Sequence, residues 1–322
     1  MPVDIPKGKA GKATSLYDNT RAKQEDSLQT TLTRIRNVQA HIEGTPRGNR
    51  LKGKVCIITG VGSLKGIGRA SAIRFAHEGA AHLYLVDYDP TNLPDLKATI
   101  EKKYPDVKVT THAFDAASEK DIIAICDQAL KEEGRLDVFF ANAGIASRDT
   151  LANTTAETFM ESMRVNSLSC FLAIKHASEA MKKTNASRGK ELSGGSIILT
   201  ASVAGIRSGA GTVDYSASKA AVNSMAKTSA YQLARTGIRV NSICPGIIET
   251  GMTTDAFEYA KQRGTQGKMG QLNPLGRWAI ADEVAQLALF LACDDSSYVN
   301  AQNIAVDAGL SSSHPTVPGR WA

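Results

Sequence analysis

Short apolar runs alternate with longer amphipathic stretches along most of this chain. The apolar runs predict buried strands, because a strand of a parallel sheet is covered on both faces and carries apolar residues at successive positions. The expected strands cover residues 54–59, 83–86, 107–114, 136–142, 195–201, 238–244 and 301–306. Helices are expected at 69–78, 119–132, 157–182, 282–292 and in a segment that ends near 235. This alternation predicts an α/β protein with a single doubly wound parallel sheet of about seven strands and helices on both faces.

Residues 1–50 follow a different pattern and are expected to form a partly disordered extension. Residues 1–20 are rich in Lys, Gly, Thr and Asp, which is typical of disorder. Further on, apolar residues recur every three or four positions and predict an amphipathic helix over 24–42. They are Leu28, Leu32, Ile35, Val38 and Ile42. Such a helix would fold back on the body, pair with another subunit or contact a membrane surface. The expected divisions are the extension 1–50, a folded domain 51–310 and a C-terminal tail 311–322.

The net charge of +6 is concentrated in the extension, where nine Lys/Arg stand against five Asp/Glu. The rest of the chain is too balanced for a nucleic-acid groove. No apolar run approaches the ~18 residues of a membrane span, and the start has no signal-peptide core, so a cytoplasmic location is expected. Mitochondrial import is the alternative, although presequences are poor in acids and this segment carries several. These acids are Asp4, Asp18, Glu25 and Asp26.

The five cysteines form an odd set without a C-x-x-C motif, and each lies in or beside an apolar segment. This pattern predicts buried free thiols in a reducing compartment. They are Cys56, Cys126, Cys170, Cys244 and Cys293. The six histidines show no ligand spacing, so no metal site is expected.

Tyr215 and Lys219 carry the clearest candidate chemistry. They are four residues apart in a stretch expected to be helical, so their side chains would lie on one face of the helix. An ammonium beside a phenol favours the phenolate and lowers the pKa of the tyrosine from its usual ~10 toward neutral pH. A tyrosine tuned in this way can act as a general acid or base. Both residue types are common on helices, so the pair alone does not establish a site.

A second candidate site follows the first strand of the body. That strand runs into Gly60-Val-Gly-Ser-Leu-Lys-Gly-Ile-Gly68, and a helix comes next. Together they predict a phosphate cradle, because glycines let the backbone approach a pyrophosphate and a helix N-terminus favours negative charge. Asp87, at the end of the next strand, is placed to bind the ribose hydroxyls of an adenosine and would repel a 2′-phosphate.

The glycine turn, the Asn142-Ala143-Gly144 segment and Tyr215-x-x-x-Lys219, in this order, resemble the motifs of the short-chain dehydrogenase/reductase family. The resemblance covers residues 51–309. It implies a Rossmann-like fold in which the 51–310 domain is an NAD(P)-dependent oxidoreductase that interconverts a secondary alcohol and a ketone by hydride transfer. It also implies a small-molecule substrate and a homodimer or homotetramer packed through the long helix and the tyrosine helix.

The resemblance assigns catalytic roles to four residues. Tyr215 would donate or accept the substrate proton, and Lys219 would lower its pKa and hold the nicotinamide ribose. Ser202, thirteen residues before the tyrosine at the end of a strand, would hydrogen-bond the substrate oxygen. Asn166, in the long helix, would position a proton-relay water.

The same resemblance implies a cofactor site built from several strand ends. Its residues are Gly60, Gly66, Ile67 and Gly68 in the glycine turn, Asn142, Ala143 and Gly144 near the adenosine ribose, and Pro245, Gly246, Ile248 and Thr250 near the nicotinamide carboxamide. Asp87 would bind the ribose hydroxyls, and Asp115 would contact adenine. Asp115 could instead cap a helix, and Thr250 could simply begin one.

Two features depart from the pattern of the main branch of the family. Five residues separate Gly60 from Gly66 where that branch has three. The enoyl-reductase branch has a similar longer turn but spaces its tyrosine and lysine by seven, so the spacing of four here favours carbonyl or alcohol chemistry. Lys65 is basic at a position where NADP-using members often carry a base, which competes with Asp87. We expect NAD, with NADP as the alternative.

Three functions compete at this point. An alcohol or ketone oxidoreductase is favoured because all four reactive positions are filled. The alternatives are a nicotinamide-binding regulatory or scaffold protein and an enoyl reductase. Substrate choice is expected to depend on 204–213, on residues after Gly144 and on the polar segment 252–278, which is interpreted as a mobile lid. The sequence does not identify the substrate or the direction of the reaction.

Overall fold

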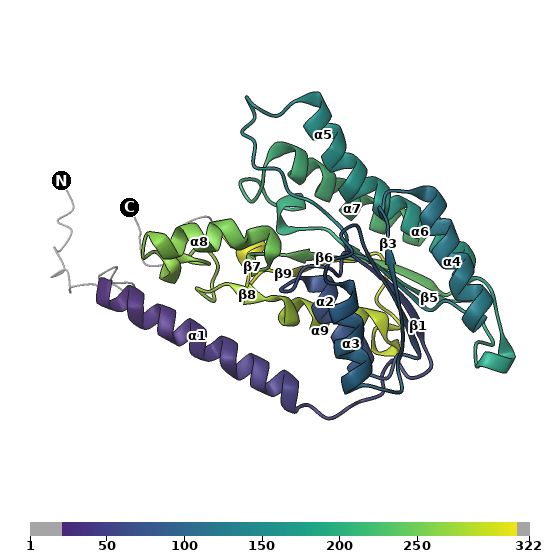
Figure 1. The fold of residues 1–322 in the computed structure, drawn as a ribbon. Helices are drawn as coiled ribbons and strands as arrows, with labels where there is room; N and C mark the ends of the chain where they lie inside the picture. Colours follow the sequence, from purple (N-terminus) through teal and green to yellow (C-terminus); the bar gives the residue numbers. More distant parts are fainter. Residues whose placement is uncertain (1–20, 314–322) are drawn as a thin grey trace, which may run out of the picture.

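The computed structural model describes residues 21–313, apart from the side chains of residues 21–24. Residues 1–20, where disorder is predicted, and the end of the predicted tail lie outside this range. Within it, one parallel sheet has the order β3-β2-β1-β4-β5-β6-β9, with helices on both faces (Figure 1). The strands are β1 (Val55–Thr59), β2 (His82–Asp87), β3 (Lys108–Ala113), β4 (Val138–Ala141), β5 (Gly195–Thr200), β6 (Ile238–Pro245) and β9 (Asn303–Val306). The predicted fold class is confirmed.

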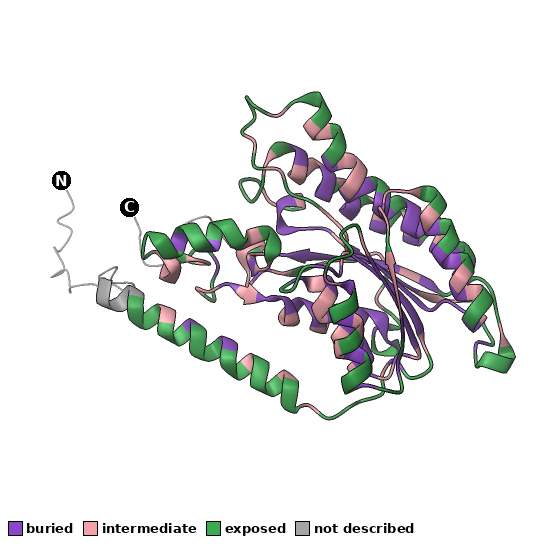
Figure 2. Ribbon diagram, in the orientation of Figure 1, coloured by how far each residue is buried: buried purple, intermediate pink, exposed green. Residues whose placement is uncertain are grey.

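Two layers of helices cover this sheet. One layer contains α2, α3 and α9, and the other contains α4, α6 and α7. Figure 2 shows the buried strands lying between them. The helices are α2 (Ile67–His77), α3 (Leu93–Lys103), α4 (Glu119–Glu133), α5 (Ala156–Met163), α6 (Ser169–Met181), α7 (Val213–Gln232) and α9 (Ala281–Ala292).

Strand β1 illustrates why the strand segments are apolar throughout. Cys56 and Ile58 face the α2, α3 and α9 layer, whereas Val55 and Ile57 face the α4, α6 and α7 layer. All four are buried. Each fully buried aliphatic side chain stabilises the fold by about 1.5–3 kcal/mol relative to exposure. All five cysteines are likewise buried and free, as predicted.

The position of β1 in the sheet determines where a ligand can bind. β2 and β3 extend to one side of β1, and β4, β5, β6 and β9 extend to the other. The connections after β1 and β4 therefore leave the sheet in opposite directions and open a crevice at the carboxyl ends of the strands. Gly60 follows β1, Asp87 ends β2, Asn142 follows β4 and Ser202 lies just beyond β5. The predicted site residues thus lie along one edge of the sheet.

Several elements differ from the sequence expectations. Helix α3 was not anticipated, and the tyrosine helix ends at Gln232. The long helix expected over 157–182 is interrupted by a π turn, η1 (Arg164–Leu168), which joins α5 to α6. The segment 252–278, expected to be a lid, contains helix α8 (Thr254–Gln262). A small ladder between β7 (Ile248–Glu249) and β8 (Ala279–Ile280) joins its two ends.

The predicted amphipathic helix is present as α1 (Arg21–Gly44), and it folds back on the body. Figure 1 shows α1 running alongside the part of the molecule that contains α8, β7 and β8. Ile35 is buried in a small apolar cluster with Phe257, Trp278 and Ile280, and Leu28 and Val38 pack against its edge. The sequence left three placements open for this helix, and in the structure it packs on the body of its own chain. No helix within the described residues is long and apolar enough to cross a membrane.

Candidate active site

Lys219 and Asn166 approach each other around Gly144, at the carboxyl edge of the sheet. The Nζ of Lys219 donates a 2.8 Å hydrogen bond to the carbonyl oxygen of Thr200, which ends β5. A Cβ atom added to Gly144 would lie 2.9 Å from Oδ1 of Asn166 and 3.2 Å from Nζ of Lys219. A side chain at position 144 would therefore force Asn166 to shift and would crowd Lys219. Glycine lets the segment after β4 pass close to both groups.

Tyr215 and Ser202 flank the loop that connects β5 to α7. The Nζ of Lys219 lies 5.6 Å from the ring centroid of Tyr215, on one face of α7 as the spacing predicted. Tyr215 is half-buried, whereas Lys219 is buried, so the phenol is the more accessible of the two. Ser202 is also buried, and its Oγ accepts a 3.1 Å hydrogen bond from the amide of Ala204. This bond orients the hydroxyl and leaves its proton available for donation.

Asn166 lies in the π turn that interrupts the long helix. Its Nδ2 donates to the carbonyl oxygen of Ile145 at 2.9 Å and to Oγ of Ser218 at 3.0 Å, and its Oδ1 accepts from the amide of Ile145 at 2.8 Å. These bonds fasten the loop after β4 to the helix that carries Lys219. A π turn widens a helix locally and is frequent at functional sites. The amide of Asn166 is thus a fixed part of the arrangement.

The lengthened glycine turn keeps its first and last glycines in contact. Gly60 has a φ of 73°, and a Cβ atom on it would lie 2.7 Å from Cα of Ala143. A Cβ atom on Gly68 would collide with the carbonyl oxygen of Gly60. Between them, the amide of Gly66 donates to the carbonyl oxygen of Ser63 at 2.9 Å, so the extra residues form a tight turn of their own. Helix α2 then begins at Ile67 with Gly66 as its N-cap. The cradle retains the open backbone that a pyrophosphate requires.

Two charged residues that bear on cofactor choice, Asp87 and Lys65, have separate partners. The carboxylate of Asp87 accepts hydrogen bonds from the amides of Gly62 at 2.7 Å and Asp89 at 3.0 Å. Its negative charge is therefore fixed beside the glycine turn. Lys65 has a partner that the sequence did not reveal, because its Nζ donates to Oε1 of Glu249 at 2.8 Å.

Asn142 and Asp115 are held by contacts of their own. The side-chain amide of Asn142 donates to the carbonyl oxygens of Thr59 and Gly60 and accepts from the hydroxyl of Thr200, so it links the ends of β1, β4 and β5. Asp115 does not cap α4, since Ser118 is its N-cap. Instead, the Asp115 carboxylate accepts from the amide of Ala117 and from Arg164.

The segment after β6 lies next to the end of β9. The amide of Gly246 donates to the carbonyl oxygen of Val306 at 2.9 Å, and a Cβ atom at Gly246 would lie 2.8 Å from Cα of Asp307. Pro245 ends β6, and Ile248 is buried in β7. Thr250 begins a short helical turn, in which its amide donates to the Thr253 hydroxyl at 3.0 Å. Thr250 thus begins a helical turn, which is the alternative given for it above. Its contact with the nicotinamide carboxamide stays a prediction.

Asp214 is a buried acid beside Tyr215 that sequence reasoning missed. Its carboxylate accepts hydrogen bonds from the hydroxyls of Ser147 at 2.7 Å and Ser162 at 2.5 Å. Burial alone would raise the pKa of Asp214, but bonds from Ser162, Ser147, Thr212 and the Tyr215 amide outweigh it and lower this pKa to about 2. Asp214 thereby joins the loop after β4, helix α5 and the start of α7. An acid in the first turn of a helix was the only signal in the sequence, because its serine partners are more than fifty residues away.

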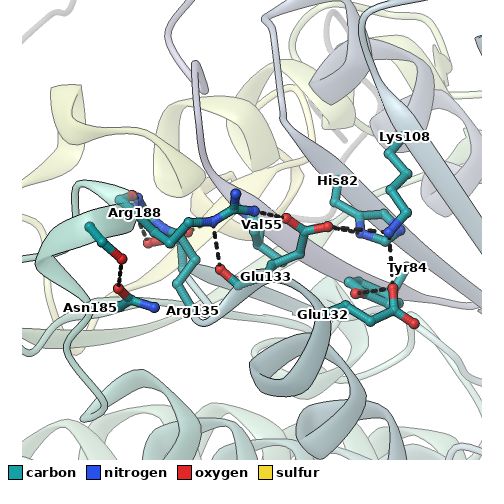
Figure 3. Close-up of polar contacts among 11 residues, drawn as sticks. Val55, His82, Tyr84, Lys108, Glu132, Glu133, Arg135, Asn185 and Arg188 are labelled. Atoms are coloured by element: carbon teal, nitrogen blue, oxygen red, sulfur yellow. Dashed lines mark hydrogen bonds and ion pairs between the residues drawn. The ribbon is translucent and has the colours of Figure 1, made fainter.

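A second polar cluster lies at the amino ends of the strands, at the opposite edge of the sheet. Figure 3 shows Glu133, at the end of α4, reached by His82 from β2 and by Arg188. The ligand atoms of His82, Glu132 and Glu133 lie within 4.8 Å of one another, a proximity that histidine spacing did not predict. The carboxylates already accept from Lys108, and Tyr84 donates to Glu132. Because these groups satisfy one another, we interpret the cluster as structural.

The fold and the geometry at the carboxyl edge define an α/β protein of the dinucleotide-binding class. A family model described as Enoyl-(Acyl carrier protein) reductase matches residues 60–311. Levodione reductase of Leifsonia aquatica is 35% identical over 82% of this chain and 97% of its own length. The 3-oxoacyl-(acyl carrier protein) reductase of Thermotoga maritima is 38% identical over 81% of this chain and 99% of its own.

Solved structures give the same result. The crystal structure of levodione reductase matches with a TM-score of 0.73 and 33% identity, covering 82% of this chain and 100% of that one. A short-chain dehydrogenase from Mycobacterium paratuberculosis bound to NAD matches with a TM-score of 0.71 and 30% identity, with the same coverage. The chain belongs to the short-chain dehydrogenase/reductase family, as its motifs indicated. It is thus an NAD(P)-dependent oxidoreductase.

Proposed function

We propose that this protein interconverts a secondary alcohol and a ketone, with Tyr215 as the general acid or base. The observation that carries the proposal is the approach of Lys219 and Asn166 around Gly144, with Tyr215 on the same helix face as Lys219. Ser202 lies just beyond β5, the strand whose last carbonyl holds Lys219. These groups come from three separate elements and are buried or half-buried along one edge.

Each residue has a defined task in this scheme. When bound, a nicotinamide dinucleotide supplies or accepts the hydride. Ser202 donates a hydrogen bond to the substrate oxygen and orients it, without transferring its proton. Tyr215 transfers a proton to that oxygen during reduction and removes one during oxidation. The Lys219 ammonium stabilises the phenolate and binds the nicotinamide ribose, and Asn166 holds the water through which the proton is exchanged with solvent.

We propose that the cradle binds NAD in preference to NADP. Side chains are excluded at Gly60 and Gly68, which leaves backbone for the pyrophosphate at the start of α2. Asp87 is fixed on the Gly62 amide, and in this proposal its carboxylate accepts from two ribose hydroxyls and repels a 2′-phosphate. We therefore expect NADH to bind more tightly than NADPH in separate fluorescence titrations. Tighter binding of NADPH would contradict this role of Asp87.

The central test is the substitution Tyr215→Phe. It removes only the phenolic hydroxyl, which carries the exchangeable proton, so turnover should fall by about 10²–10⁴-fold while NADH binding stays near that of the parent protein. Tyr231→Phe, at an exposed tyrosine of the same helix, is the matched control and should leave both unchanged. Levodione and a 3-oxoacyl thioester are suitable first substrates because two relatives carry these names. Full turnover by the Tyr215→Phe protein would refute the assignment.

An enoyl reductase is the second candidate, favoured by the description of the matching family model. The two functions differ in the bond that is reduced, C=O or C=C. Reduction of a carbonyl needs a proton donor directly beside its oxygen. The Tyr215–Lys219 spacing of four and the serine at position 202 support the carbonyl reaction. NADH oxidation with a 3-oxoacyl thioester but not with the matching enoyl thioester is the expected result. The opposite preference would favour the enoyl reaction.

A further inference from the structure

The lengthened glycine turn and the basic residue within it, Lys65, contact the side chain of Glu249. The lengthened glycine turn contributes Lys65, whose Nζ donates to Oε1 of Glu249 at 2.8 Å. The other carboxylate oxygen of Glu249 accepts from the indole nitrogen of Trp278 at 3.1 Å. Glu249 lies in β7 and Trp278 immediately precedes β8, so the carboxylate is held at the base of the 252–278 segment.

The N-terminal extension reaches the same place. Trp278 is almost fully buried, and it packs with Phe257 in a T-shaped arrangement with ring centroids 5.5 Å apart. Ile35 of α1 completes this apolar cluster, together with Ile280. The matched family segment begins at residue 60, so α1 lies outside it. Removing α1 would expose one side of the cluster that orients the Trp278 indole.

A second contact joins the glycine turn to this region. A Cβ atom added to Gly251 would lie 2.6 Å from Oγ of Ser63. Ser63 starts the tight turn formed by the extra residues, and Gly251 follows Glu249 by two positions. The inserted turn therefore rests on the start of the 252–278 segment at two points. Exposed ion pairs alone contribute little, but a carboxylate oriented by a buried indole loses less conformational entropy when it binds Lys65.

We propose that α1 is a positioning element of the cofactor site. By packing on Trp278 it keeps Glu249 in place, and Glu249 in turn fixes the lengthened glycine turn and withholds Lys65 from a 2′-phosphate. The proposal rests on the cofactor role given above to the glycine turn and Asp87. It makes Glu249 a determinant of the preference for NAD over NADP.

The consequence for binding is specific. With Glu249 in place, the charge of Lys65 is compensated and Asp87 acts on the adenosine end of the cofactor unopposed. When Glu249 is neutralised or displaced, Lys65 is free to attract the two negative charges of a 2′-phosphate. The ratio of NADPH to NADH affinity should therefore rise, and the inserted turn should become more accessible to protease.

The test uses full-length variants and two readouts. Separate NADH and NADPH titrations give the affinity ratio, and brief trypsin digestion of the cofactor-free protein, followed by mass spectrometry, gives cleavage after Lys65. Glu249→Gln and Ile35→Glu should each raise the ratio by about two- to fivefold and increase this cleavage. Gln39→Glu places the same charge on an exposed position of α1 and should change neither. In a Lys65→Met background, Glu249→Gln should no longer alter the ratio.

Trp278→Phe covers the case in which Ile35→Glu does not fold, because it keeps an aromatic ring in the cluster and removes the donor to Glu249. It should act in the same direction as Glu249→Gln. Parental affinity ratios and cleavage in Glu249→Gln would overturn the proposal. If Glu249→Gln changes the affinity ratio and the cleavage but Ile35→Glu and Trp278→Phe change neither, α1 does not position Glu249. Failure of the parent protein to bind either dinucleotide would instead refute the proposed function, and the digestion would still report on the link.

Discussion

At the scale of single residues, the candidate pair Tyr215 and Lys219 stands next to a buried acid, Asp214, whose charge is held by hydrogen bonds. Tyr215 and Lys219 share a helix, so their spacing alone predicts their proximity. Asp214 precedes them directly, yet its importance depends on Ser147 and Ser162, which approach it only in the folded chain. Asp214 anchors the first turn of α7 and with it the backbone of Tyr215.

Substituting Asp214→Asn should therefore weaken both folding and catalysis. The asparagine amide can accept from only one of the two serine hydroxyls, so the free energy of unfolding should fall by about 2 kcal/mol at neutral pH. The kcat should also be lower, because the backbone of Tyr215 is less well held. The pKa of Asp214 is depressed from 3.8 to about 2 in the folded protein. Its stabilising contribution is thus complete above about pH 4 and is lost as the pH falls toward 2.

Urea unfolding across this pH range would measure the effect. The difference between the parent protein and Asp214→Asn should shrink on acidification, whereas the exposed Asp127→Asn should match the parent throughout. A difference that stays constant down to about pH 2 would show that the Asp214 charge is not the stabilising group.

At the scale of elements, the glycine turn and the long helix show two ways in which local patterns are modified. The insertion in the turn forms a compact turn at Ser63–Gly66, so Gly60 and Gly68 still meet. The long helix contains a π turn at Asn166, which apolar periodicity cannot reveal because the buried residues of the turn, Asn166 and Ser167, are polar. In both cases the type of element was predicted correctly. Its irregular part is held by contacts with other parts of the chain.

Helix α4 is secured at its C-terminal end by the Glu133 cluster. Burial would raise the pKa of Glu133, but hydrogen bonds from His82 and Lys108 outweigh it and lower that pKa. The side chains of Lys108 and Arg188 are about half exposed and can return to water. Glu133→Gln should therefore cost about 1–3 kcal/mol rather than the larger penalty of a fully buried pair.

Thermal or urea unfolding of Glu133→Gln measures this cost. Glu101→Gln, which breaks an exposed pair with Lys97, should change stability by at most about 0.5 kcal/mol. Because Glu133 lies at the edge opposite the candidate active site, kcat below the unfolding transition should stay at the parental value. A selective loss of kcat without loss of stability would contradict a structural role for the cluster.

At the scale of the whole molecule, an apolar face on α5, η1 and α6 bears on the predicted assembly. Met160, Leu168 and Phe171 are exposed there, around a hollow that Ala221 and Met225 of α7 also line. Exposed apolar groups in one patch indicate a protein interface. We expect the homodimer or homotetramer to bury this face. The assembly itself stays a prediction.

Phe171→Glu should disrupt such an assembly, because an unpaired carboxylate in an apolar interface costs several kcal/mol. Light scattering coupled to gel filtration would show the mass of a smaller species, with unfolding of the isolated chain little changed. Leu192→Glu, at an exposed leucine in the connection between α6 and β5 that does not line this hollow, is the control and should keep the parental mass. Retention of the parental oligomer by Phe171→Glu would remove this face from the interface.

The sequence by itself determined the parallel α/β class, the seven strands of the sheet and most of its helices along the chain, the glycine turn and the tyrosine–lysine spacing. These features follow from local periodicity and short spacings, which operate within a few residues. The tertiary structure alone decided that α1 packs on Trp278, that Glu249 binds Lys65, and that Ser147 and Ser162 hold Asp214. Each of these contacts joins residues separated by tens to hundreds of positions. Their energies depend on burial and on exact side-chain placement, and both arise only when the sheet and its helices have packed.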